Sequence, residues 1–246
     1  MPGTLPKESD FPANVTVAII PAPKSQKPVN ILILLHGLGD THTPFATFGT
    51  KLQLPETACI SLRAPADMPF DLGGFHWGDN IMFDQNTEEM EIDTGFKKST
   101  KLVLEDVVRK TLVKKCGYGL REIVLLGFGQ GGMVAVNVAA ELGLGEELGG
   151  VVSIGGPLPG NSTLPDRASK KKQTPIVICK GNRMSAINEI NAQRLKDTFQ
   201  FLEVVQWKRP GDGMPATKEE MMPIMQFFAR RLRSMKGVPE GSIAIG

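Results

Sequence analysis

The sequence predicts an α/β protein in which a mostly parallel central sheet is covered by helices on both faces. Two observations predict this fold class. Short, nearly continuous apolar runs recur along the chain, as expected for strands that are buried on both faces. Helical patterns separate most of these runs, and strands that alternate with helices are typical of parallel sheets. The chain has 246 residues, of which 41% are hydrophobic and 22% charged, so it can build one sizeable core.

The individual elements follow from their apolar periodicity. Seven segments are predicted to be strands: 14–20, 29–35, 58–63, 122–126, 150–154, 175–179 and 201–207. Helices are predicted from Gly95 onward and over 133–142, 187–199 and 217–234. The long segment 64–94 has no clear pattern, and such a segment is usually a lid or a binding loop. We therefore expect a flexible N-terminus over 1–13, a single domain over 14–236 and a flexible tail over 237–246.

The first predicted helix shows its buried face most clearly. Five residues that a helix would place on one side are Leu104, Val107, Val108, Thr111 and Leu112, whereas lysines and acids fall opposite.

Composition excludes several classes of protein and favours a cytoplasmic one. The formal net charge is +2, which points to neither nucleic acid nor an acidic partner. The cysteines, Cys59, Cys116 and Cys179, are scattered and odd in number, which favours reduced thiols in the cytoplasm or, as an alternative, the nucleus. We expect no secretory signal and no membrane span. The run Lys170–Lys172 and the acidic residues of 88–93 are interpreted as solvated surface.

Residues 125–132 read LLGFGQGG, a strand that ends in glycines before an apolar helix. Serine hydrolases carry their nucleophile on such a strand–turn–helix, within the pattern G-x-S-x-G. Here the central position is Gly129. Residues 127–132 also fit the spacing of the nucleotide-binding pattern G-x-G-x-x-G, but the motifs that flank them favour the hydrolase turn, so no nucleotide cofactor is expected.

Further motifs extend this comparison over residues 14–234. They are LLHGLGDT at 34–41, Arg63-Ala64-Pro65, GGFHW at 73–77, IDTGFKKS at 92–99 and GVVSIGGPLPG at 150–160. Taken in this order, the motifs resemble the phospholipase/carboxylesterase branch of the α/β-hydrolases, which includes the acyl-protein thioesterases. The resemblance implies the α/β-hydrolase fold and a family that cleaves acyl esters or thioesters with serine, aspartate and histidine.

The resemblance places different side chains at all three catalytic positions of that family. The serine position falls on Gly129, the aspartate position on Met184 and the histidine position on Ala216. No histidine follows His76 and no acid lies within 180–188. Serine chemistry needs a base and an oriented carboxylate as well as the nucleophile. We therefore expect a degenerate catalytic triad and no catalytic residue.

The main chain around Gly129 provides the candidate ligand-binding residues. Leu38 and Gln130 stand where the family's main-chain N–H groups face the developing oxyanion, and the following helix adds a positive dipole end. Such groups can hold a carboxylate, a carbonyl or a phosphate, although the fold alone would also retain them. Trp77 and Phe75 are candidates to line an acyl groove, or to form the local core of their loop.

Other reactive side chains are weaker candidates. Cys179 ends a strand near the former active site but lacks a recognisable base, and His36 is interpreted as structural. A metal site of His42 and His76 has no supporting ligand spacing, so no metal is expected. Ser153 and Ser185 are interpreted as packing or turn residues.

These observations lead to a sequence-based hypothesis about function. We expect a protein that is not an enzyme and that acts by binding or regulating a protein partner, without a cofactor. One alternative is a binder of small acyl ligands. Another is an active carboxylesterase or acyl-protein thioesterase with an atypical nucleophile, for which Cys179 and His36 are the candidates.

Overall fold

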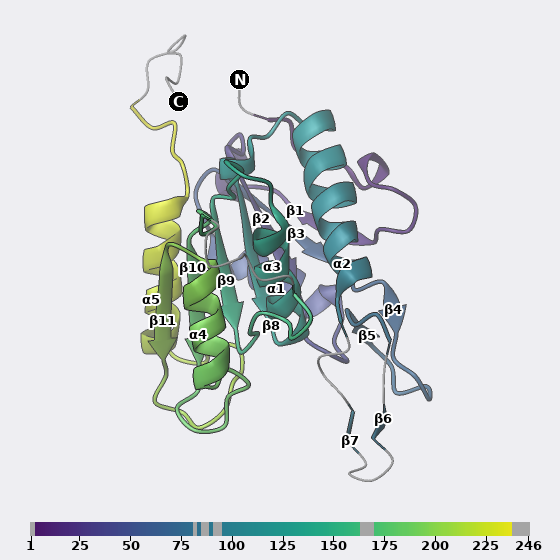
Figure 1. The fold of residues 1–246 in the computed structure, drawn as a ribbon. Coiled ribbons are helices and arrows are strands. Elements are labelled where there is room, and N and C mark those ends of the chain that lie inside the picture. Colours follow the sequence, from purple (N-terminus) through teal and green to yellow (C-terminus); the bar gives the residue numbers. More distant parts are fainter. Residues whose placement is uncertain (1–2, 81–82, 85–88, 91–94, 163–169, 238–246) are drawn as a thin grey trace.

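A seven-stranded sheet forms the centre of the computed structural model, which describes residues 3–80, 83–84, 89–90, 95–162 and 170–237 (Figure 1). The strand order is β1-β3-β2-β8-β9-β10-β11. Only β1 runs antiparallel to its neighbour, and the other five pairings are parallel. The strands are β1 (Val17–Ile20), β2 (Asn30–Leu35), β3 (Thr57–Leu62), β8 (Ile123–Phe128), β9 (Gly150–Ile154), β10 (Ile176–Lys180) and β11 (Leu202–Gln206). The predicted mostly parallel sheet is confirmed.

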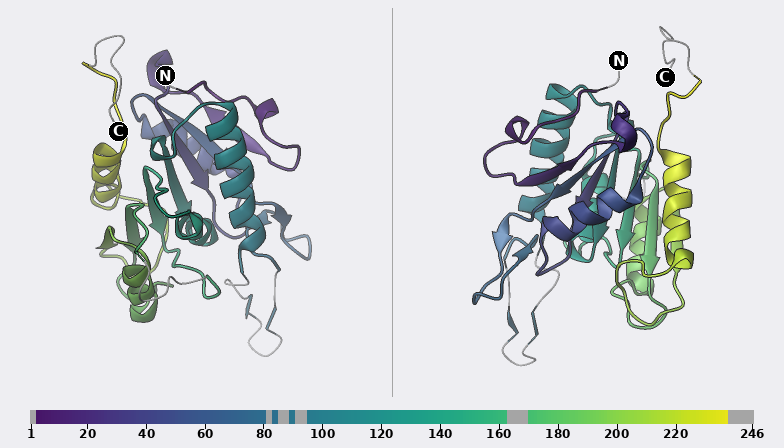
Figure 2. Two further views of the ribbon diagram at one scale, coloured as in Figure 1. Left: turned by 45° about the horizontal axis from the view of Figure 1, so that its top comes forward. Right: turned by 180° about the vertical axis from the view of Figure 1, so that it is seen from behind.

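Helices cover both faces of this sheet, as Figures 1 and 2 show. On one face lie α3 (Gln130–Glu141), α4 (Glu189–Thr198) and α2 (Lys97–Lys101), which continues into the π-helical η3 (Leu102–Lys115). The other face carries α1 (His42–Leu52) and α5 (Lys218–Arg231). Alternate residues of β2 divide between the two layers: Ile31 and Ile33 pack towards α3, whereas Leu32 and Leu34 pack towards α1. A strand buried on both faces must be apolar throughout, which is why β2 shows no alternation.

The segment 64–94, expected to be irregular, contains two short hairpins. In the first, β4 (Ala66–Asp67) pairs with β5 (Phe75–His76). The second joins β6 (Phe83–Asp84) and β7 (Glu89–Met90), and the rest of 81–94 lies outside the described residues. The first hairpin is tied to the turn after β2, because the N–H of Gly39 donates to Phe75 O and the N–H of Phe75 donates to Asp40 O. Strands of two residues are too short to leave a periodic signal.

Helix α1 is an element that the sequence pattern did not predict. Thr41 caps it by accepting a hydrogen bond from Thr43 N, and its buried face consists of Phe45, Gly49 and Leu52. Threonine, proline and glycine make up five of the 11 residues of this helix, and all three have low helix propensity. Packing against β3 and β2 therefore stabilises α1 more than its own sequence does.

Three short 3₁₀ helices complete the described elements: η1 (Glu8–Asp10), η2 (Pro23–Ser25) and η4 (Leu120–Glu122). Within the segment 1–13, the N–H of Thr4 donates to Cys116 O, and Phe11 belongs to the core.

Close contacts between main chains join β8, the following turn and α3 to their neighbours. A Cβ atom added to Gly127 would lie 2.2 Å from Gly131 O, and one added to Gly131 would lie 2.3 Å from Leu35 O. An added Cβ at Gly132 would lie 2.5 Å from Ser153 Oγ. Only glycine allows this approach, so these residues fix where α3 begins.

We predict that Gly127→Ala destabilises the fold strongly, because its methyl group would overlap main-chain atoms that cannot move independently. The loss should be at least about 2 kcal/mol of unfolding free energy, in the upper range for overpacking. Urea denaturation measures it. Gly119→Ala is the control, since an added Cβ there meets nothing nearer than 3.7 Å, and its stability should change by less than about 1 kcal/mol. Equal stabilities of the two variants would contradict this account.

Candidate functional site

The turn between β8 and α3 has a backbone conformation that side chains rarely adopt. Gly129 has φ 52° and ψ −119°, and its N–H donates to Ile154 O at 2.9 Å. Its carbonyl accepts the N–H of Met133 at 3.0 Å, which closes the first turn of α3. A Cβ atom at this position would meet nothing within 4 Å. The turn therefore projects position 129 into open space, although the glycines around it are tightly packed.

A buried hydrogen-bond network holds this turn to the loop after β2. The indole Nε1 of Trp77 donates to His36 O at 2.8 Å, and the N–H of Trp77 donates to Gln130 Oε1 at 3.0 Å. Ser99 Oγ, at the start of α2, donates to Trp77 O. Trp77 is completely buried and so lies in the core of its loop. The network positions Gln130, the first residue of α3, relative to the turn that carries Leu38.

His36 is held as a neutral imidazole by two main-chain partners. Its Nδ1 lies 2.7 Å from Gly37 O, and its Nε2 accepts the N–H of Ala64 at 3.0 Å. These contacts are consistent with a proton on Nδ1. Burial lowers the pKa of this imidazole below its ordinary value, although the Gly37 carbonyl opposes that shift. With both nitrogens engaged, His36 is suited to a structural role.

The other two positions implied by the resemblance lie on the loops that follow β10 and β11. Met184 is 73% exposed, and its N–H donates to Pro210 O at 2.9 Å. Ala216 is exposed and immediately precedes the Thr217 cap of α5. Parallel strands place both loops at the carboxyl edge of the sheet, the edge where β8 ends at Gly129.

Asp212 is a residue of this edge that sequence reasoning missed. Its carboxylate accepts the N–H of Gly181 at 2.8 Å and that of Ala186 at 3.1 Å, so it connects the loops after β10 and β11. Gly155, after β9, leaves room for Asp212, because an added Cβ there would lie 2.7 Å from Asp212 Cβ. An acid within the Pro-Gly-Asp-Gly segment after the last strand was the signal available in the sequence.

The candidate nucleophiles are poorly suited to attack. Cys179 is fully buried, and burial raises the pKa of its thiol to about 12, so almost no thiolate forms near neutral pH. Ser153 is also fully buried and donates to Gly156 O at 2.6 Å. The hydroxyl oxygen of Ser185 accepts the N–H of Ile187 at 3.1 Å.

His42 and His76 show no arrangement typical of a metal centre. Among the described residues, no group of three or more His, Cys, Asp or Glu side chains could hold an ion. Burial lowers the pKa of both imidazoles. The three cysteines are free and buried. Within the described part of the chain, no helix is long and apolar enough to cross a membrane.

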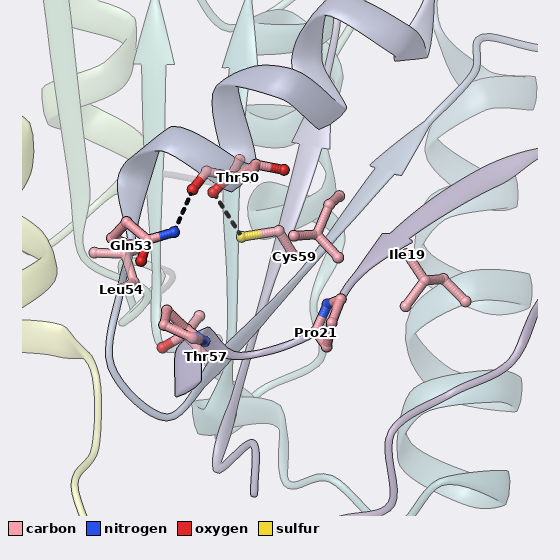
Figure 3. A pocket seen from close by; sticks show the side chains of 10 residues that line it. Ile19, Pro21, Thr50, Gln53, Leu54, Thr57 and Cys59 are labelled. Atoms are coloured by element: carbon pink, nitrogen blue, oxygen red, sulfur yellow. Dashed lines mark hydrogen bonds between the residues drawn. The ribbon is translucent and has the colours of Figure 1, made fainter. Parts of the chain in front are cut away.

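A pocket of 340 Å³ lies between α1 and the strands β1 and β3 (Figure 3). Thr57 lines it at the beginning of β3, so it lies towards the amino edge of the sheet, away from Gly129. Cys59 points into this region, where its Sγ contacts Gly49 O, and burial raises its pKa to about 12. This pocket is therefore separate from the turn that carries Gly129.

Comparison with known proteins identifies a matching family and several relatives. The model of the phospholipase/carboxylesterase family matches residues 16–232. "Uncharacterized hydrolase C9G1.08c" of Schizosaccharomyces pombe is 32% identical over 231 residues, which cover 91% of each chain. Acyl-protein thioesterase 1 of Debaryomyces hansenii is 27% identical over 212 residues, covering 80% of this chain and 89% of the relative.

Solved structures confirm the expected α/β-hydrolase fold. Esterase PE8 superposes with a TM-score of 0.70 at 18% identity, covering 89% of this chain and 99% of that chain. Acyl-protein thioesterase 2 of Zea mays gives a TM-score of 0.62 at 20% identity, with the same coverage of each chain.

The sequence-based expectation of a protein that is not an enzyme, because it lacks the triad, is wrong. A family of phospholipases and carboxylesterases matches most of the chain, and the relatives are named hydrolases and thioesterases. The absence of familiar side chains at three positions was too narrow a basis for excluding catalysis. The binding roles of Leu38, Gln130 and Trp77 stay predictions.

We predict that the fold loses stability as the pH falls below about 6.5, the ordinary pKa of histidine. His36 has a lowered pKa in the folded chain, so the unfolded chain binds more protons in this range. The loss from one such histidine is at most about 1.4 kcal/mol per pH unit. Thermal unfolding between about pH 5 and 8 measures it. His36→Gln should flatten the profile, whereas the more exposed His42→Gln should change it less. An unchanged profile in His36→Gln would contradict this assignment.

Proposed function

Because the chain belongs to the phospholipase/carboxylesterase family, we propose that it hydrolyses acyl thioesters, and more slowly acyl esters, at the turn around Gly129. The observation that carries the proposal is the open space beside Gly129, in a turn whose surroundings are otherwise closely packed. In relatives that use serine, the nucleophile stands at this position. Here the space has room for a water molecule in place of a side chain.

The main chain would stabilise the reaction. Leu38 and Gln130 are the positions whose N–H groups would face the carbonyl oxygen as it becomes an oxyanion, and the dipole of α3 favours that negative charge. Trp77 forms hydrogen bonds to His36 O and to the Gln130 side chain, so it would hold the loop after β2 in place relative to the start of α3. Its indole would therefore contribute through these contacts while remaining in the core.

The proposed step consumes one water molecule. The water oxygen attacks the carbonyl carbon, the bond from that carbon to sulfur or oxygen breaks, and both water protons pass to solvent, which returns one to the leaving sulfur or oxygen. The products are a carboxylate and a thiol or an alcohol. A thiolate leaves without being protonated first, since thiol pKa values lie near 8.5, whereas an alkoxide needs a proton. With no imidazole after His76, we expect thioesters to be the better substrates.

The expected rate is modest. Oxyanion stabilisation and binding alone leave roughly 10³–10⁴-fold acceleration over water in serine hydrolases that lack their triad. We infer an acceleration of that order for this chain. The role of regulating a protein partner was deduced from absent catalysis and has no support of its own. Cytoplasmic location stays an expectation.

We predict that the purified chain releases thiol from an octanoyl thioester roughly 10³-fold faster than buffer, and from the matching oxygen ester less effectively. Thiol release measures the rate, and the activity must co-elute with the protein. In ¹⁸O-labelled water one labelled oxygen should enter the product acid. A fluorophosphonate probe should leave the chain unlabelled, because water is the nucleophile. Binding of a thioether analogue without turnover of the thioester would contradict hydrolysis and favour an acyl-ligand binder.

We predict that Gly129→Ala lowers this activity at least about tenfold, because a methyl group would occupy the space assigned to water. The variant should also lose about 1 kcal/mol of stability, since φ at this position is positive. Gly117→Ala is the matched control: Gly117 also has positive φ and open space, but it lies before β8, at the opposite end of that strand from Gly129. Equal activity in the two variants would show that the space beside Gly129 is not used.

A further inference from the structure

Strand β11 lies at the end of the sheet, and among the residues that the structure describes no strand pairs with its outer edge. Its odd-numbered residues bond to β10: the N–H of Ile176 donates to Phe201 O, and that of Trp207 donates to Lys180 O. In a parallel ladder the residues between these turn their N–H and C=O groups the other way. Val204 and Gln206 therefore present donors and acceptors along the end of the sheet, and Val204 is 44% exposed.

A pocket of 660 Å³ lies at the carboxyl end of this edge. One wall is formed by Val205 and Gln206 at the end of β11 and by residues 207–209, which follow the strand. The other wall is formed by Thr217, which caps α5, and by Glu219, Glu220 and Pro223 of that helix. The pocket therefore lies where the edge strand ends, beside the start of α5.

Trp207, which lines this pocket, has a buried donor without an acceptor. Its side chain is 4% exposed, and its Nε1 has no hydrogen-bond partner among the described residues. The Arg209 guanidinium covers the ring at 4.5 Å and contacts the Glu220 carboxylate at 3.4 Å. An unsatisfied buried N–H costs about 1–3 kcal/mol, and a carbonyl oxygen from a ligand would remove that cost.

The charged side chains that line the pocket balance one another, which favours an uncharged ligand group. The cations Lys208 and Arg209 are balanced by Glu219 and Glu220. A neutral acceptor therefore fits better than a carboxylate or an ammonium group, and a side-chain amide offers such a carbonyl.

We propose that β11 binds an extended segment of a partner protein by strand addition, with an asparagine or glutamine side chain of that segment in the Trp207 pocket. The partner's backbone pairs with Val204 and Gln206, and its amide carbonyl accepts the Trp207 Nε1–H. Natural edge strands are usually protected against such pairing, so an exposed edge beside an unsatisfied donor is a recognition surface. This binding does not depend on hydrolysis at Gly129.

The probe is a random library of displayed peptides of about ten residues. An extended peptide rises roughly 3.3 Å per residue, so each peptide is long enough to span β11. The library is selected on the immobilised full chain. Enriched peptides should have β-branched residues at alternate positions and should contain one Asn or Gln. They should lose at least tenfold in affinity for Val204→Pro, which removes an outward N–H and no ladder bond. Ile19→Pro changes an outward N–H on the opposite edge strand and is the control. Failure to enrich peptides, or equal binding to both variants, would overturn the proposal.

Nuclear magnetic resonance gives a second readout, because the chain has two tryptophans and so two indole N–H signals. The selected peptide should move the Trp207 signal and leave that of Trp77, which already donates to His36 O. Trp207→Phe assigns the signals and should weaken binding about three- to tenfold, the loss of one hydrogen bond. Binding that leaves the Trp207 signal unmoved would overturn the assignment of the pocket.

Discussion

The close approach of main chains around β8 and α3 is the constraint on which the rest of the site depends. Carbonyl groups at the end of β2 lie against Gly131, and Gly156 lies against Gly129. No side chain fits at these contacts, so strand, turn and helix can assemble in one arrangement only. That arrangement places the start of α3 beside the loop after β2. The fold's requirement for glycine therefore also fixes the geometry of the turn at which we propose that an acyl carbonyl binds.

Burial then converts this geometry into an electrostatic environment. His36 is neutral because desolvation lowers its pKa, and its carbonyl accepts the Trp77 indole. The main-chain N–H of Trp77 donates to the Gln130 side chain. Hydrogen bonds in such a low-dielectric region strengthen one another and fix a unique arrangement. A carbonyl substrate at the turn would meet dipoles that are already oriented, so less reorganisation is needed as charge develops.

The sequence predicted the elements that have a continuous or periodic apolar pattern and missed those that lack one. Strands such as β9 were placed residue for residue, because a doubly buried strand is apolar throughout. Helix α1 was missed because its stability comes from packing, and β4 and β5 because they span two residues each. At the site, Gly129 was recognised from a local motif. Asp212 was not, since its role arises only when loops from three strands meet.

Membership of a hydrolase family and a glycine at position 129 are compatible, because the main chain and the catalytic side chains contribute to hydrolysis in different ways. In serine hydrolases the main chain supplies oriented dipoles, whereas the triad supplies a covalent route and proton transfer. Glycine at the turn relieves the strain that a side chain with positive φ would carry, and under the proposed mechanism no covalent route is needed there. In the proposed step, water beside Gly129 would need no acyl-enzyme intermediate, but its protons would be removed slowly. The proposed preference for thioesters follows from that slow step, because a thiolate departs without first being protonated.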